Sequence, residues 1–194
     1  MIPILLLFGC SMLLCGCSMQ NPTQMALKVR EVYANIETID AETTVFMDLG
    51  ERTQTYRLSW TYDVSSGSKV TVIEPDTISG ISITTTDNAL TFEYDDAVLV
   101  VPVSDGLSMQ SPLEALPSTL RDYSNGVYTE CSREKIDDED VFSITYEDSE
   151  KGKTHRVWFR YDSLTPIISE IYLDGRMTMR ISYDMFESRG TINE

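Results

Sequence analysis

The alternation of apolar and polar residues along this chain changes its period once, near residue 40. Before that point apolar residues recur at steps of three and four: Met25, Val29, Val32, Tyr33 and Ile36. This spacing places them on one face of an amphipathic helix. We expect the helix to begin at Gln24 and to end between Thr38 and Asp40.

After residue 40 the period becomes two, which is typical of strands. In the segment TYRLSWTYDV, the apolar side chains share one face: Tyr56, Leu58, Trp60, Tyr62 and Val64. The same alternation recurs to Tyr183 and predicts about eleven strands, with short turns rich in Gly, Asp or Asn. Because each strand has one polar face, we expect an antiparallel meander that is solvated on one side. A sheet of this length twists and curls, or splits in two.

One long stretch, GLSMQSPLEALPSTLRDYSNG, interrupts the strands at residues 106–126. Ser111, Pro112 and Glu114 fit an N-cap, a first-turn proline and a capping-box glutamate, and therefore predict the start of a helix. Pro117 should split or kink that helix into two short pieces.

This helical flap is placed to cover the concave side of the curling sheet. Three leucines fall on one helical face and are the candidate lid residues: Leu113, Leu116 and Leu120. If the concave side is hollow, they touch a guest or the cavity mouth. If it is filled, they belong to an ordinary core.

The N-terminal apolar run spans about a dozen residues, whereas a membrane-spanning helix needs about 20. Its length fits the core of a signal peptide, although no Lys or Arg precedes it. The run ends in Leu14-Cys15-Gly16-Cys17, which resembles a bacterial lipobox. We predict cleavage before Cys17 and attachment of a diacylglyceryl group to its sulfur. Cys10 and Cys15 fit the motif less well, and a buried N-terminal helix with incidental cysteines is the alternative.

These features predict the following organisation: a signal peptide over 1–16, a lipidated tether over 17–23, one domain over 24–187 and a tail over 188–194. Two acyl chains give lasting membrane attachment. We therefore expect an extracytoplasmic protein, anchored to the outer leaflet of the cytoplasmic membrane or to an outer membrane.

Composition and charge exclude several classes of function. The net charge of −16 opposes nucleic-acid binding, which needs clustered Lys and Arg. Cys131 is the only cysteine beyond the leader, so no internal disulfide is expected; a small apolar role is favoured over a reactive thiol. His155 is the only histidine, which argues against a zinc site.

Catalytic and calcium-binding patterns are weak. Ser132 to Lys135 spell S-x-x-K, but the partner motifs of penicillin-binding enzymes are missing. The acidic run Asp137–Asp140 lacks the glycine and closing glutamate of an EF-hand loop, which favours a solvated turn. We expect no enzyme, no cofactor and no metal site.

Three segments resemble the LolA/LolB-like lipoprotein-carrier superfamily: Glu74-Pro75 after a Val-rich strand, DGLSMQSPLEALPSTL with its P-L-x-x-L core, and the late hairpin VWFRYDSLTPIISEIYLDG. The resemblance implies a mainly β fold with flanking helices (α+β), in which an unclosed antiparallel half-barrel is capped by an N-terminal helix and a mid-chain helical lid. It also implies an apolar interior that receives acyl chains. Carriers hold their lid closed with an arginine, for which Arg121 is a candidate.

We therefore predict that the concave face binds an acyl chain, a lipid or a lipoprotein. The candidate cavity residues come from the apolar faces of the strands: Trp60, Tyr62, Phe92, Phe142, Phe159, Met179 and Ile181. The germination lipoproteins of spore-forming bacteria look similar, yet act by binding a cell-wall amidase. A non-catalytic protein that binds an envelope partner, such as a cell-wall hydrolase, is the alternative. It would need an exposed sheet edge or apolar patch.

Overall fold

The computed structural model describes residues 21–86, 89–102, 111–150 and 152–190; the leader and Cys17 lie outside these ranges. The first half of the chain contains α1 (Pro22–Ala34), β1 (Ile36–Asp48), β2 (Thr53–Asp63), β3 (Gly67–Glu74), a short 3-10 helix (Asp76–Ile78), β4 (Ser82–Thr85), β5 (Ala89–Tyr94) and β6 (Ala97–Pro102). The second half contains α2 (Pro112–Asn125), β7 (Tyr128–Ile136), β8 (Glu139–Asp148), β9 (Lys153–Arg160), β10 (Pro166–Leu173) and β11 (Arg176–Gly190).

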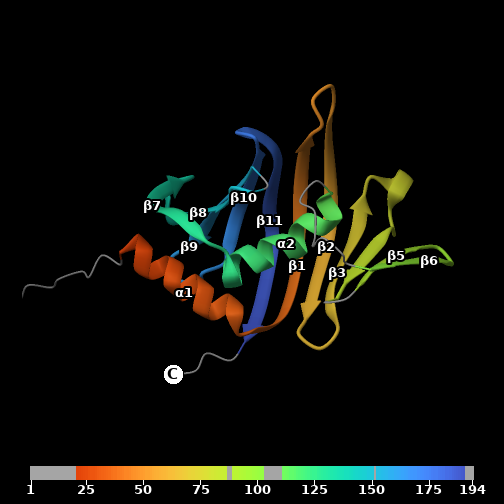
Figure 1. Cartoon of the computed structure of the whole chain (residues 1–194), viewed down its shortest axis with the longest axis horizontal. Helices are drawn as coiled ribbons and strands as arrows, with labels where there is room; N and C mark the ends of the chain where they lie inside the picture. The colour runs from red at the N-terminus through yellow and green to blue at the C-terminus, as the bar shows by residue number, and fades with distance from the viewer. Residues whose placement is uncertain (1–20, 87–88, 103–110, 151, 191–194) are drawn as a thin grey trace, which may run out of the picture.

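The strands form one antiparallel sheet of 11 strands in the order β6-β5-β4-β3-β2-β1-β11-β10-β9-β8-β7. The chain meanders from β1 out to one edge at β6, and α2 then carries it across the sheet towards β7 at the other edge (Figure 1). A second meander returns to β11, which pairs with β1. The two edge strands β6 and β7 are not paired with each other, so the sheet stays open. This arrangement confirms the predicted half-barrel with an N-terminal and a mid-chain helix.

The first helix begins earlier and ends earlier than its sequence pattern predicts. Asn21 is its N-cap, and the Asn21 side chain accepts a hydrogen bond from the Thr23 backbone at 3.1 Å. The helix ends at Ala34, and Ile36 already belongs to β1. The segment after Asn35 is rich in β-branched residues, which favour a strand. Pairing with β2 and β11 on both sides stabilises this longer strand.

The flap is one helix, and the prediction of two short pieces is wrong. Pro117 lies inside α2, where its ring removes one backbone hydrogen bond. The helix nevertheless continues, because most of the residues from Ala115 to Leu120 are buried against the protein. Ser111 is the N-cap residue as predicted, but its side chain makes no capping hydrogen bond.

The apolar faces of the strands meet the two helices on the concave side of the sheet. Met25, Val29 and Tyr33 of α1 are buried there, together with Leu116 and Tyr123 of α2. Figure 1 shows both helices lying across the same face of the sheet. The hydrophobic core is therefore a single layer between the sheet and the two helices.

Candidate functional site: a cleft beside a filled core

The predicted cavity residues gather on the concave face. Five of them have no accessible surface: Trp60, Phe142, Phe159, Met179 and Ile181. Tyr62 and Phe92 are half-buried and pack against the same cluster. A side chain without accessible surface borders no water-sized void. The part of the concave face beneath the helices is therefore a packed core. Five of the seven candidate residues belong to this core, and Tyr62 and Phe92 pack against it.

The three lid candidates also differ in burial. Leu116 has no accessible surface, Leu120 is 8 % exposed and Leu113 is half-buried. Leu116 and Leu120 belong to the same core cluster as the sheet residues, and Leu113 packs against it. Their positions make α2 an integral part of the packing.

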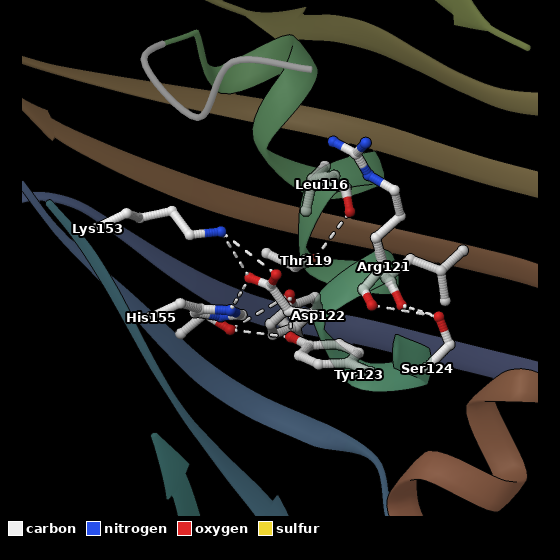
Figure 2. Close-up of polar contacts among 11 residues, drawn as sticks. Leu116, Thr119, Arg121, Asp122, Tyr123, Ser124, Lys153 and His155 are labelled. Atoms are coloured by element: carbon white, nitrogen blue, oxygen red, sulfur yellow. Dashed lines mark hydrogen bonds and ion pairs between the residues drawn. The ribbon is translucent and has the colours of Figure 1, made fainter. Parts of the chain in front are cut away.

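A polar cluster that the sequence analysis did not identify joins α2 to β9. Asp122 of α2 accepts a hydrogen bond from His155 Nδ1 at 2.9 Å and forms an ion pair with Lys153 Nζ at 3.1 Å. Figure 2 shows both side chains pointing toward the Asp122 carboxylate. The Lys153 and Asp122 side chains are largely buried, and His155 is completely buried. We call Asp122, Lys153 and His155 the anchor cluster.

The carboxylate of the anchor cluster stays ionised to low pH. Burial alone would raise the pKa of Asp122, but the hydrogen bond from His155 and the nearby charges of His155 and Lys153 outweigh it. The pKa therefore lies below its usual range. Because a carboxylate only accepts hydrogen bonds, His155 carries a proton on Nδ1. Its buried Nε2 has no hydrogen-bond partner in the described part of the chain.

Tyr123, the next residue of α2, adds hydrogen bonds to two further strands. Its hydroxyl lies 3.0 Å from Ser169 Oγ on β10 and 2.9 Å from the Tyr183 hydroxyl on β11. Its ring stacks on His155, with ring centroids 5.7 Å apart. Burial raises the pKa of Tyr123 well above its usual value, so the hydroxyl remains a donor. Asp122 and Tyr123 together fix α2 to the sheet.

Arg121 does not hold the helix down. Its side chain is exposed and has no hydrogen-bond or ion-pair partner among the described residues. In Figure 2 its guanidinium extends away from the Asp122 carboxylate. Among the described residues, polar contacts between this part of α2 and the sheet come instead from the neighbouring Asp122 and Tyr123.

Among the described residues, an open cleft of about 590 Å³ lies beside the C-terminal half of α2. It lies between the end of α1, the β2–β3 turn, the end of β4 and the C-terminal half of α2. Tyr62 and Leu120 are the predicted site residues that line it. Apolar atoms come from Ala34, Ile36 and Pro117, and hydroxyl groups come from serines and threonines of the facing strands. A volume of this size is typical of small-ligand sites.

The edge strand β6 carries four consecutive exposed large hydrophobic residues, Val98 to Val101. Val98, Leu99 and Val100 are each at least 60 % exposed, and these consecutive residues point to both faces of the sheet. The strand AVLVVP contains no charged residue. Edge strands are usually protected by charges or bulges, so an unprotected one is a candidate for pairing with another chain.

The other candidates from the sequence are structural. Ser132 bonds to Glu134 and Ser143 on the outer face, and Lys135 pairs with Asp140. Glu134 also accepts hydrogen bonds from Arg156 and Trp158. Desolvation alone would raise the pKa of Glu134, but the hydrogen bonds to its carboxylate outweigh this effect and lower the pKa to about 2.

Cys131 is half-buried against the core, and burial raises the pKa of its thiol. Within the described ranges, no three His, Cys, Asp or Glu side chains converge as a metal site requires. Neither described helix has the length and apolar character needed to cross a bilayer.

Comparison with solved structures finds similar chains, and the likeness concerns the fold alone. The chain is similar to an uncharacterized conserved protein from Thermus thermophilus (7 % identity, 88 % and 90 % of the two chains covered, TM-score 0.55). It is also similar to a LolA superfamily protein from Nitrosomonas europaea (15 % identity, 89 % and 96 % covered, TM-score 0.43). A third similar structure is that of the CwlD amidase from Clostridioides difficile in complex with the GerS lipoprotein (17 % identity, 86 % and 93 % covered, TM-score 0.45). No protein-family model and no curated protein sequence matches the chain.

Proposed function

We propose that this chain is a lipid-anchored, extracytoplasmic binding protein without catalytic activity, and that it holds a hydrophobic ligand in the open cleft of its half-barrel. The ligand would be an acyl chain, carried by a lipid or by a lipoprotein. The observation that carries the proposal is the cleft of about 590 Å³, which joins the concave face to solvent.

Two properties of the cleft favour binding over a purely structural role. It is bordered by apolar groups of Ala34, Ile36 and Pro117, which an acyl chain can cover without losing hydrogen bonds. Its walls come from elements that are already fixed, because α2 is held by the anchor cluster and by Tyr123. A preformed site loses little conformational entropy when a ligand binds.

Filling the cleft should abolish binding of a neutral hydrophobic probe. Ala34 is exposed at the end of α1 and lines the cleft, so an indole at this position would occupy the ligand volume. We expect Ala34→Trp to weaken binding of N-phenyl-1-naphthylamine by about tenfold or more, which corresponds to about 1.4 kcal/mol. Fluorescence titration measures this affinity.

A matched control separates blocking of the cleft from a general effect of tryptophan. Leu27 lies on the same helix, is 52 % exposed and does not line the cleft. Leu27→Trp should bind the probe as the unaltered chain does. Absence of saturable binding to the unaltered chain would remove the basis of the proposal.

Attachment to the membrane is expected through Cys17, which lies outside the described residues. Mass spectrometry of the protein extracted from membranes should find a mature chain that begins at Cys17 and carries a diacylglyceryl group. Cys17→Ala should remain unprocessed and without lipid. A Cys17→Ala chain that still carries lipid would show that the anchor is elsewhere.

Binding of a protein partner is the second candidate function, and β6 is the observation that favours it. An extended apolar segment of another protein could pair with its free edge and cover Val98, Leu99 and Val100. Replacing Val100 with lysine would place a charge on this edge and should prevent such pairing.

A further inference from the structure

We infer that the cleft selects an anionic amphiphile, and that Arg121 supplies the positive charge that meets its headgroup. This inference rests on the proposed function, because it names the chemical class of the ligand for the same cleft. Three features of the described residues carry it: the charge of Arg121, the hydroxyl groups of one wall and the apolar groups of the other.

The first feature is an unpaired cation in a strongly acidic protein. Most described Lys and Arg side chains form ion pairs with Asp or Glu: Arg57, Lys69, Arg133, Lys135, Lys153, Arg156, Arg160, Arg176 and Arg180. Arg121 has no such partner among the described residues, although the chain contains 31 acidic residues. The described residues that line the cleft include no Asp or Glu. An anion in the cleft thus meets one positive charge, and the carboxylate beside it, Asp63, is turned to Ser65 and Ser66, from whose backbone it accepts hydrogen bonds at 2.8 and 3.2 Å.

The second feature is a hydroxyl-rich wall opposite α2. Ser68 of β3 and Thr85 of β4 are directly opposed in the sheet, and both line the cleft. Ser68 Oγ accepts a hydrogen bond from Trp60 Nε1 at 2.7 Å, which fixes its position and leaves its own proton to donate. Thr85 Oγ1 is buried and has no hydrogen-bond partner among the residues that the structure describes. An unsatisfied buried hydroxyl is costly, and because Thr85 Oγ1 has almost no accessible surface, a ligand oxygen would satisfy it only if the cleft wall shifts to expose it.

The third feature is the apolar surface beside these polar groups. Leu120 and Pro117 lie on α2 in the same stretch as Arg121, and Ile36 faces the cleft from β1. A ligand that uses all three features has an acyl chain, oxygen acceptors and a negative charge at one end. Phospholipids with an anionic headgroup have this composition. A free phosphate would use only the polar part.

Two lysolipids with the same palmitoyl chain test the inference: the anionic lysophosphatidylglycerol and the zwitterionic lysophosphatidylcholine. Their affinities for the full chain carrying Cys17→Ser are measured below their micellar concentrations by displacement of the neutral fluorophore. We expect the anionic lipid to bind about tenfold more tightly, as one partly exposed charge-assisted hydrogen bond allows. Arg121→Gln should remove this preference, and Arg121→Lys should keep most of it. Arg52→Gln removes an equal charge outside the cleft and should leave the preference unchanged.

Several results would overturn the inference, and each has a different consequence for the proposed function. Equal affinity of the unaltered chain for both lipids removes the headgroup selection and leaves the proposed function intact. Equal loss in Arg52→Gln and Arg121→Gln would assign the preference to overall charge. Displacement of the anionic lipid by inorganic phosphate at the same concentration would mean that the acyl chain contributes nothing. If neither the lipids nor the neutral fluorophore bind, the proposed function fails first.

Discussion

Replacing Leu116 with alanine should lower the free energy of unfolding by about 2–5 kcal/mol, the usual cost of removing a large aliphatic side chain from a packed core. Leu116 has no accessible surface and belongs to the cluster that joins α2 to the sheet. For a domain of this size, the change corresponds to a fall in Tm of about 4–20 °C. Thermal unfolding followed by circular dichroism measures it.

Leu113 provides a control on the same helix. It is half-buried and packs only at the border of the core, so Leu113→Ala should cost about half as much or less. If α2 were instead a detachable lid over a hollow interior, both changes would leave Tm nearly unchanged. A fall in Tm of under about 2 °C for Leu116→Ala would therefore contradict the packed core.

Removing the carboxylate of Asp122 should have an effect of similar size. The variant Asp122→Ala leaves Lys153 and His155 in a largely buried site without their acceptor. Breaking a buried pair from one side typically costs about 3–5 kcal/mol, because the remaining polar group is uncompensated. Asp48, which pairs with Arg176 near the surface, is the control: Asp48→Ala should destabilise the protein much less than Asp122→Ala, because solvent screens an exposed ion pair. Chemical denaturation of the two variants beside the unaltered chain gives the comparison.

The anchor cluster also predicts how stability depends on pH. The pKa of Asp122 is lower in the folded protein than the ordinary value of 3.8 for an aspartate. The unfolded state therefore binds more protons, and stability rises with pH across this interval. The contribution of Asp122 is complete above the ordinary carboxyl pKa and is lost as the pH falls through the lower folded-state pKa. Asp122→Ala should lose less stability than the unaltered chain as the pH falls below the ordinary carboxyl pKa, and equal slopes would contradict this assignment.

The approximate positions of the strands could be predicted from the sequence because most strands have one apolar face. The alternation of Tyr56, Leu58, Trp60 and Tyr62 identifies the concave side of β2, and the structure places these residues on that side. Boundaries were less accurate. Ile36 continues the helical spacing of α1, but it is also the first β-branched residue of a strand that pairs on both sides. Pairing with the distant strand β11 places Ile36 in β1 and not in the helix.

Packing and polar contacts were harder to predict from single residues. Pro117 predicts a break, yet burial of the surrounding turn keeps α2 continuous. Whether Trp60 and Phe159 line a hollow or a core depends on how closely two helices fill a curved sheet, which alternation does not encode. The anchor cluster had one signal: His155 lies on the dry face of β9 with Val157 and Phe159, and a buried histidine needs a polar partner. The sequence did not indicate that this partner was Asp122.

The most direct test of hydrophobic-ligand binding is native mass spectrometry of the full-length protein released gently from its membrane, with a crosslinked sample beside it. We predict a non-covalent lipid in a 1:1 ratio with the chain, absent from Ala34→Trp and retained by Leu27→Trp. The contradicting result is a chain that carries no lipid and is instead crosslinked in a 1:1 ratio to an envelope protein, with Val100→Lys abolishing that crosslink. Ligand binding in the cleft would then give way to strand pairing at β6.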